Sequence, residues 1–323
     1  MRWSTPEFDL IDRHFTRSSR RADTVLGLGD DAALIQPPQG SWLVATTDTM
    51  VCGTHFLPDA DPGGLGHKLL AVNLSDLAAM GADPAWLTLA LTLPRIDHEW
   101  LTAFSAGLFA LAETVGAELV GGDITRGPLT CTLQALGTVP THRALRRAGA
   151  KPGDGVYVSG TLGDAALALA LRLEGADVSA ALAERLDRPT PRVALGRALR
   201  EWASAAIDLS DGLLADLGHL CASSGVGATI FHTDIPRSPA FRSAARGALD
   251  ADLPLNGGDD YELCFTLPEH HAAHVEALTE AGGCPITRIG CITAEPSVRC
   301  HDAAGRPVVV TRSGFDHFNP ATS

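Results

Sequence analysis

The stretch Ala205-Ala206-Ile207-Asp208-Leu209-Ser210-Asp211-Gly212 decides the fold expected for this chain. Its apolar first half predicts a strand, its acidic second half predicts a turn, and residues 213–222 read as the helix that follows. Strands that end in polar residues and lead into helices are typical of α/β proteins, in which ligands bind at the carboxyl ends of the strands. The sequence therefore predicts an α/β fold with oxygen ligands at such junctions.

Two earlier stretches repeat this arrangement. Trp42–Asp48 is a predicted strand whose last residues change from apolar to Thr46, Thr47 and Asp48. Ala117–Asp123 is a second predicted strand, and it runs into two glycines and an aspartate. Glycines at such a position let backbone N–H groups approach an anion closely. For Asp48 alone, a turn cap and a functional carboxylate are equally good interpretations.

Paired aspartates follow glycines near both ends of the chain. Gly29-Asp30-Asp31-Ala32 precedes a short apolar run, and Gly257-Gly258-Asp259-Asp260-Tyr261-Glu262 precedes a strand predicted from Leu263. A buried pair of like charges is costly unless a cation or hydrogen-bond donors compensate it. An isolated pair is usually a turn cap beside a solvated carboxylate. The recurrence of acidic junctions along the chain favours a shared function instead.

The most apolar predicted helix carries two polar groups on one face. Asp61-Pro62 predicts the N-cap and first residue of this helix, and Gly81 predicts its end. The apolar residues between these ends almost encircle the axis, which indicates a buried helix. Asn73 and Asp76 are three residues apart and therefore project from the same side. A buried aspartate needs a partner, and a metal ion or a basic group fits better than water.

The composition limits the classes of function. A net charge of −13 argues against nonspecific binding to nucleic acids or anionic membranes. The length of 323 residues suffices for two domains or one large α/β domain, and a basic, turn-rich connection near residues 140–155 predicts a boundary. The seven cysteines form no C-x-x-C pair, so we expect mostly buried thiols. The charged N-terminus and the lack of long apolar runs predict a cytoplasmic protein.

The acidic residues predict magnesium chemistry. No Cys/His ligand set accompanies them, which disfavours zinc, and oxygen ligands with hydroxyl groups nearby favour Mg²⁺. The sequence has no P-loop, no G-x-G-x-x-G opening a βα unit and no kinase H-R-D set. An enzyme that uses a nucleoside triphosphate here would belong to a class in which metal ions neutralise the phosphates.

The acidic motifs occur in the order typical of one family. They are Gly29-Asp30-Asp31-Ala32, Thr46-Thr47-Asp48-Thr49, Asn73-Leu74-Ser75-Asp76-Leu77-Ala78-Ala79-Met80-Gly81, Gly121-Gly122-Asp123, Asp208-Leu209-Ser210-Asp211-Gly212 and Gly257-Gly258-Asp259-Asp260-Tyr261-Glu262-Leu263. This ordered set resembles the bacterial thiamine-monophosphate kinases. The resemblance implies a two-domain α/β (α+β) architecture like that of aminoimidazole ribonucleotide synthetase. Residues 1–140 would bind ATP and Mg²⁺ and form a homodimer, and residues 141–323 would complete the ATP and substrate sites.

The resemblance also implies the reaction and its residues. ATP would phosphorylate thiamine monophosphate to thiamine diphosphate by direct in-line transfer with several Mg²⁺ ions. The implied metal ligands are Asp31, Thr46, Thr47, Asp48, Asp76, Asp123, Asp208 and Asp211. The implied ATP contacts are Gly122, Asp123, Arg147 and Ser210, and the implied substrate contacts are His55, Glu262 and Phe315. No general base is required, because a phosphate monoester with a second pKa of about 6 is already ionised near neutral pH.

Two alternatives remain open at this point. One is another ATP-using enzyme of the same architecture, such as a selenophosphate synthetase, which would carry a reactive Cys or selenocysteine near its N-terminus. The first cysteine here is Cys52. The other alternative is a noncatalytic metal-binding or scaffold protein, which has no reason to bind ATP and Mg²⁺ cooperatively. Asp259 stands where many relatives would carry Glu, and the sequence leaves open whether Asp30 reaches a metal.

Overall fold

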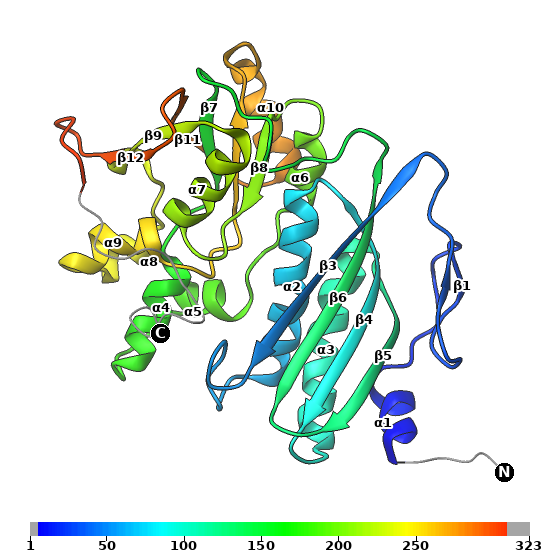
Figure 1. Ribbon diagram of the computed structural model, residues 1–323. Helices are drawn as coiled ribbons and strands as arrows, with labels where there is room; N and C mark the ends of the chain where they lie inside the picture. Colours follow the sequence, from blue (N-terminus) through cyan, green and yellow to red (C-terminus); the bar gives the residue numbers. More distant parts are fainter. Residues whose placement is uncertain (1–5, 309–323) are drawn as a thin grey trace. The chain divides into compact units, whose positions relative to one another are not determined.

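The structure, a computed structural model, describes residues 6–308 and divides into two compact units. The described part of unit 1 runs to Leu77 and resumes over Ala82–His142. Unit 2 contains Ala78–Gly81 and the residues from Arg143 onward. Each unit has its own main sheet, of four strands in unit 1 and six in unit 2 (Figure 1).

Unit 1 is a sheet covered by two long helices. Its elements are α1 (Pro6–His14), β1 (Thr24–Leu26), β2 (Leu34–Ile35), β3 (Ser41–Val51), α2 (Pro62–Ala79), β4 (Asp83–Leu93), α3 (His98–Val115), β5 (Glu118–Arg126) and β6 (Thr130–Pro140). The strand order is β3-β6-β4-β5, and only the β4–β5 pair is parallel. Helices α2 and α3 cover one face of this sheet, as Figure 1 shows.

Helix α2 confirms the prediction from the sequence. The Asp61 carboxylate accepts the N–H of Gly64 at 2.7 Å, which is the bond expected of an N-cap residue. The helix ends at Ala79, and nearly all of its residues are buried. Asn73 is fully buried, while Asp76 is partly accessible. The helix therefore holds its polar groups at a fixed position beneath the sheet.

Two strands extend further than predicted. Strand β3 continues to Val51 because it pairs with β6 along its whole length, so Asp48 lies inside the strand. Strand β5 continues to Arg126 because it pairs with β4, so Asp123 also lies inside a strand. The prediction that these two carboxylates mark strand ends is wrong. In both cases backbone pairing with a neighbouring strand outweighs the local turn signal.

Unit 2 contains a six-stranded sheet of order β12-β9-β11-β7-β10-β8. Its strands are β7 (Gly155–Ser159), β8 (Ala205–Asp208), β9 (Gly227–Phe231), β10 (Leu263–Leu267), β11 (Ile286–Thr293) and β12 (Val298–His301). Its helices are α4 (Asp164–Leu173), α5 (Ala180–Asp187), α6 (Val193–Leu199), α7 (Leu213–Ser224), α8 (Pro239–Ala244), α9 (Ala248–Asn256) and α10 (Val275–Gly282), with short 3₁₀ turns η1 (His232–Asp234) and η2 (Glu269–His274). The predicted strand β8 and helix α7 are confirmed.

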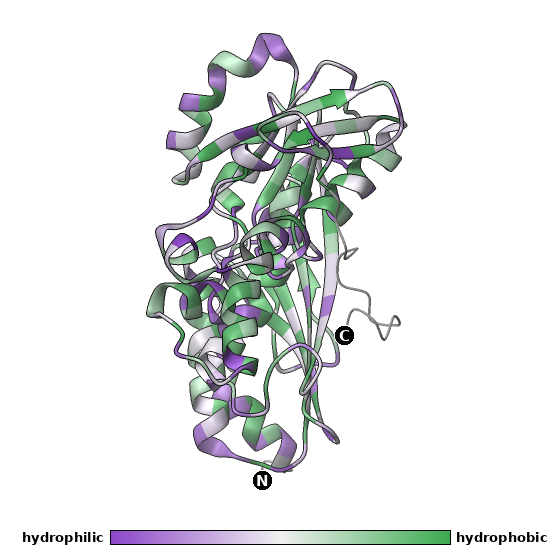
Figure 2. Ribbon diagram, turned by 90° about the vertical axis from the view of Figure 1, so that its left-hand side faces the viewer, coloured by the Kyte–Doolittle hydropathy of each residue, from purple (hydrophilic) through white to green (hydrophobic). Residues whose placement is uncertain are grey.

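The distribution of hydrophobic residues agrees with this arrangement. Figure 2 shows mostly hydrophobic colour along the strands and hydrophilic colour on loops and outer helix turns. The seven cysteines are all free thiols, and five of them are buried, as predicted. Within residues 6–308 no helix combines the length and apolar character that crossing a membrane requires.

Candidate functional site

Asp48 and Asp76 form a carboxylate pair in unit 1. Thr46 and Asp48 are alternate residues of β3, so both side chains point to the same face of the strand. The Thr46 hydroxyl donates a short hydrogen bond to Asp76 on α2. Among the described residues, no donor reaches the buried Oδ2 of Asp48. Burial and, secondarily, the Asp76 charge raise the pKa of Asp48 to about 6. The ionised pair therefore requires a compensating cation.

This pair fits a magnesium ion better than zinc. The side-chain carbonyl oxygen of Asn73, one turn from Asp76 on α2, is also buried, and no donor from the described residues reaches it. Within the part of the chain that the structure describes, no three His, Cys, Asp or Glu side chains form a ready metal cage. Mg²⁺ does not need one, because it binds through one or two carboxylates together with water and substrate phosphates. The donor set present is therefore the oxygen-only set that suits Mg²⁺.

We expect Asp48→Asn to stabilise the metal-free protein above pH 6. Folding raises the pKa of Asp48 from 3.8 to about 6, so the parent loses folding free energy as the pH rises through this interval. The Asn amide cannot ionise, so the variant does not lose this folding free energy. The difference between variant and parent amounts to about 1–3 kcal/mol at pH 7.5. Urea unfolding in EDTA at pH 4 and pH 7.5 measures the difference.

The control for this measurement is Asp59→Asn, an exposed aspartate in the same unit. Its free energy of unfolding should stay within about 0.5 kcal/mol of the parent at both pH values. A loss of stability in Asp48→Asn at pH 7.5 would contradict the assigned pKa and the need for a cation.

Asp123 lies apart from Asp48. Asp48 pairs with Leu133 of β6, and Leu133 pairs with Leu89 of β4. Leu89 in turn pairs with Gly122 of β5. Three strand spacings separate Asp48 from Gly122 by about 14 Å, and Asp123, the next residue, points to the opposite face of the sheet. Asp48 and Asp123 of one chain therefore cannot ligate the same ion.

The remaining predicted residues of β3 and β5 occupy the surface. Thr47 is exposed on the face of β3 opposite to Asp48. Gly122 has φ +153°, and a Cβ there would lie 2.0 Å from the carbonyl oxygen of Leu89, so only glycine fits. Gly122 and Asp123 line a small cavity together with Leu28, from the loop that carries the first Asp-Asp pair. The structure thus brings the Gly29–Ala32 motif and the Gly121–Asp123 motif to the same region of unit 1.

Two other predicted residues of unit 1 lie in turns. Asp31 is exposed, and its N–H donates to the carboxylate of Asp30 at 2.9 Å, so Asp30 acts as a turn cap. His55 follows β3, and its Nδ1 accepts the N–H of Val51 at 3.0 Å. Phe315 lies outside the described residues.

In unit 2, two acidic motifs lie side by side. Asp208, the last residue of β8, is 5% exposed and pairs with Leu263 of β10. The N–H of Asp259 donates to the carbonyl oxygen of Ser210 at 2.9 Å, and the N–H of Tyr261 donates to the carbonyl oxygen of Leu209 at 2.8 Å. The backbone of the second Asp-Asp motif therefore fixes the turn that carries Ser210. Arg147 is exposed in the same unit.

Sequence reasoning missed Asp216. Its Oδ2 accepts the N–H groups of Ser210, Asp211 and Gly212, each at 3.1 Å. Burial and the Asp211 charge raise the pKa of Asp216 to about 7, against the opposing effect of these three bonds. An aspartate in the first turn of α7, directly after the acidic turn, was the available signal.

Sequence reasoning also missed the side chains around Glu262. The Glu262 carboxylate is fully buried and accepts four donors. Arg192 donates through Nε at 2.6 Å and through a terminal nitrogen at 2.5 Å, Arg185 donates at 3.0 Å, and the Ser159 hydroxyl donates at 2.5 Å. A Cβ at Gly160 would lie 2.1 Å from Glu262 Oε1, so this close approach requires glycine. Glu262 is therefore the centre of a buried ion-pair network.

Acidic neighbours extend this network. Asp260 is 3% exposed, and both of its carboxylate oxygens accept the N–H of Gly163, at 3.0 and 2.9 Å. Burial raises the pKa of Asp260 well above its ordinary value. Arg185 also donates to the backbone carbonyl of Asp260 and lies 3.8 Å from the carboxylate of Asp164. The two arginines thus compensate several carboxylates beside the strand β10.

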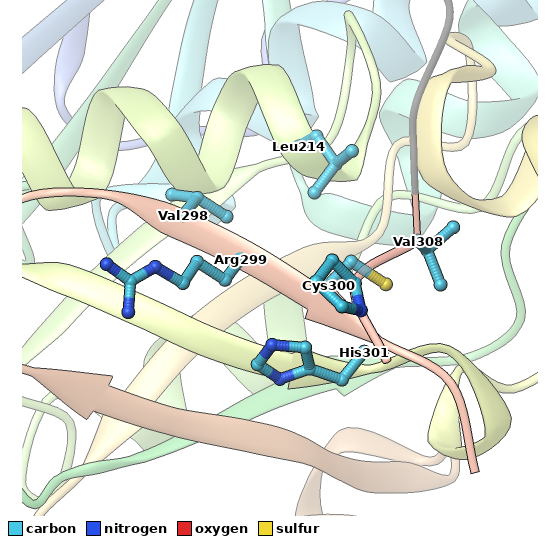
Figure 3. A pocket seen from close by; sticks show the side chains of 7 residues that line it. Leu214, Val298, Arg299, Cys300, His301 and Val308 are labelled. Atoms are coloured by element: carbon cyan, nitrogen blue, oxygen red, sulfur yellow. The ribbon is translucent and has the colours of Figure 1, made fainter. Parts of the chain in front are cut away.

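A separate pocket lies along β12. Figure 3 shows Val298 and Cys300 on the side of the strand that faces Leu214 of α7, with Arg299 and His301 on the other side. Leu214 and Val298 pack against the core cluster of unit 2. Among the predicted site residues that the structure describes, none lines this pocket. The pocket is therefore separate from those residues.

Comparisons with known proteins show the family of this chain. The AIR synthase related protein N-terminal domain matches residues 29–139, and the corresponding C-terminal domain matches residues 151–303. The thiamine-monophosphate kinase of Salmonella typhimurium is 50% identical over 97% of this chain and 98% of its own. The crystal structure of thiamine-monophosphate kinase from Stenotrophomonas maltophilia K279a is 48% identical, with a TM-score of 0.87 over 94% of this chain and 98% of its own.

A solved structure with ligands is also similar. AaThiL complexed with AMPPCP and TMP has 31% identity and a TM-score of 0.76, and the similarity covers 90% of this chain and 92% of that chain. The two matched domains and the acidic turns define an AIR synthase related protein. Within that class, the chain belongs to the thiamine-monophosphate kinase family.

Proposed function

We propose that the protein transfers the γ-phosphoryl group of ATP to thiamine monophosphate, giving thiamine diphosphate and ADP. The structural observation that carries the proposal is the Asp48–Asp76 pair, with its buried oxygen that no described donor reaches. The relatives named thiamine-monophosphate kinase and the AaThiL complex with AMPPCP and TMP support it. Both substrates are anionic and the protein has a net charge of −13, so bound cations are needed to bring them together.

Mg²⁺ is the proposed cofactor. When bound, it neutralises phosphate charge and orients the transferred group for in-line attack. The proposed ligands are Asp31, Thr46, Thr47, Asp48, Asp76, Asp123, Asp208 and Asp211. The separation of Asp48 from Asp123 supports at least two distinct ions for these ligands within one chain. The acceptor phosphate has a second pKa of about 6, so no protein base removes a proton from it.

The other contacts are proposed from the same resemblance. Gly122, Asp123, Arg147 and Ser210 contact ATP, and His55, Glu262 and Phe315 contact thiamine monophosphate. Stacking of Phe315 on the cationic thiazolium ring contributes about 0.5–2 kcal/mol. Glu262 already accepts four donors, so direct contact with the substrate requires that one of them, such as the Ser159 hydroxyl, gives way.

A homodimer in the cytoplasm is the proposed state of the protein. The uncovered face of the unit 1 sheet includes the exposed residues Leu43, Ala45 and Thr47 of β3. An exposed sheet face with apolar side chains is a suitable surface for pairing with a second copy. Residues 1–140 are the proposed dimerisation and ATP/Mg²⁺-binding domain, and residues 141–323 complete the two substrate sites.

Product analysis tests the reaction. Purified protein should form thiamine diphosphate from thiamine monophosphate only when both ATP and Mg²⁺ are present. Free thiamine is the control substrate, and it should yield no phosphorylated product. Absence of thiamine diphosphate over a range of divalent metals would refute the proposed function, and phosphorylation of thiamine itself would reassign the substrate.

A further inference from the structure

One internal carboxylate holds the turn that carries Ser210 and Asp211. Oδ2 of Asp216 accepts three consecutive N–H groups at 3.1 Å, those of Ser210, Asp211 and Gly212. The Asp216 side chain is 3% exposed. Consecutive N–H groups that converge on one oxygen are the arrangement by which proteins bind an external anion. In this turn, the acceptor is a carboxyl oxygen of the protein itself.

The three hydrogen bonds to Asp216 determine which groups of the turn can bind a ligand. Since the three N–H groups are already used by Asp216, they do not bind a phosphate in this conformation. The side chains of Ser210 and Asp211 are the groups left to meet a nucleotide or its metal ion, and both are partly accessible. The directions of these side chains depend on the shape of the turn.

The turn is clamped from two sides. Asp216 binds its N–H groups, while the N–H of Asp259 binds the carbonyl oxygen of Ser210 at 2.9 Å. The Asp259 contact is a backbone bond, so a change of the Asp216 side chain removes neither of its atoms. Among the described residues, the Asp216 carboxylate is therefore the side chain that binds the N–H side of the turn, while the backbone of Asp259 binds the opposite side.

We propose that Asp216 is a positioning residue, which holds Ser210 and Asp211 in the orientation that binds the Mg²⁺–ATP complex. This inference rests on the proposed function and adds a residue that touches neither substrate. If Asp216 served stability alone, its loss would lower the free energy of unfolding without a selective effect on Mg²⁺ or ATP. The two roles are therefore distinguished by kinetics on folded variants.

The test compares Asp216→Asn with Asp154→Asn as a matched control. Asp154 is also buried in unit 2, at 6% exposure, and its carboxylate accepts the N–H of Lys151 at 3.0 Å and the hydroxyl of Ser204 at 2.6 Å. Ser204 precedes β8 and Asp208 ends it, so Asp154 lies at the opposite end of that strand. The control therefore removes a comparable buried charge far from the acidic turn.

We expect Asp216→Asn to raise the Mg²⁺ concentration for half-maximal rate and the KM for ATP by about tenfold, because a neutral amide oxygen then replaces the charged carboxylate as the acceptor of the three N–H groups. The KM for thiamine monophosphate should change less than about twofold, because the Glu262 carboxylate is held by Arg192, Arg185 and Ser159 and not by Asp216. Asp154→Asn should leave all three values near those of the parent. Asp216→Glu, which keeps the charge, should recover part of the ATP affinity.

Two results would overturn the inference. One is an equal rise in the KM of both substrates, and the other is unchanged Mg²⁺ and ATP dependence in a folded Asp216→Asn protein. If Asp216→Asn does not fold, Asp216→Glu is measured in its place, and a rise of less than about tenfold in the KM for ATP that Asp154→Asn does not show supports the inference. If the parent shows no turnover, calorimetric binding of Mg²⁺–AMPPCP still decides: weaker binding in the variant supports positioning, and equal binding overturns it.

Discussion

Asp48→Asn and Asp208→Asn are each expected to lower kcat by at least about 10³-fold, which corresponds to about 4 kcal/mol of transition-state stabilisation. Asp48 has a buried oxygen that no described donor reaches, and Asp208 is 5% exposed at the end of β8. An amide removes the negative charge that would hold a metal ion while keeping nearly the same shape. The measurement is the rate of thiamine diphosphate formation at saturating ATP and Mg²⁺.

The control is again Asp59→Asn, which should retain the kcat of the parent because Asp59 is exposed in the segment before α2 and is not among the proposed site residues. Circular dichroism should show that all three variants are folded. A normal kcat in either Asp48→Asn or Asp208→Asn would count against the metal-based mechanism. A lowered kcat that Mn²⁺ or a higher Mg²⁺ concentration partly restores would agree with this mechanism.

Arg192→Ala is expected to lower the free energy of unfolding by about 3–5 kcal/mol, the usual cost of leaving a buried charge without its partner. Arg192 supplies two of the four donors to Glu262, at 2.6 and 2.5 Å, and Glu262 is fully buried. Arg185 and Ser159 remain, but the nearby carboxylates Asp164 and Asp260 add repulsion. Urea unfolding of the full chain, followed by circular dichroism, measures the loss.

Arg299→Ala is the matched control for this second prediction. Its ion pair with Glu295 has side chains that are 50% and 64% exposed, and such surface pairs contribute at most about 1 kcal/mol. A loss in Arg192→Ala no larger than that in Arg299→Ala would show that the Glu262 network does not stabilise the fold. Replacing Arg192 by Lys should recover only part of the loss, because lysine lacks the paired donors.

The local elements could be predicted because their signals are local. Helix α2 begins at an Asp-Pro pair and ends at Ala79, two residues before Gly81, and its apolar residues surround the axis, as expected of a buried helix. The acidic turn after β8 is followed by α7, as the sequence indicates. The acidic motifs, taken in order, also led to the correct family.

The positions that depend on pairing between distant segments could not be predicted. The sequence does not reveal strand order, so it does not show that β3 and β5 are the two edges of one sheet with Asp48 and Asp123 far apart. Glu262 and Arg192 are 70 residues apart, and Arg192 follows a stretch without a periodic pattern, where the structure forms α5. Charges that compensate each other across such distances leave no local signature.

The most direct test of the proposed function is a single-turnover reaction with ATP labelled in its γ-phosphoryl group. Excess protein is mixed with labelled ATP, Mg²⁺ and thiamine monophosphate, and the products are separated after quenching. Direct in-line transfer predicts that the label appears in the terminal phosphate of thiamine diphosphate in step with ADP. Label found only in inorganic phosphate, or bound covalently to the protein, would contradict the proposal.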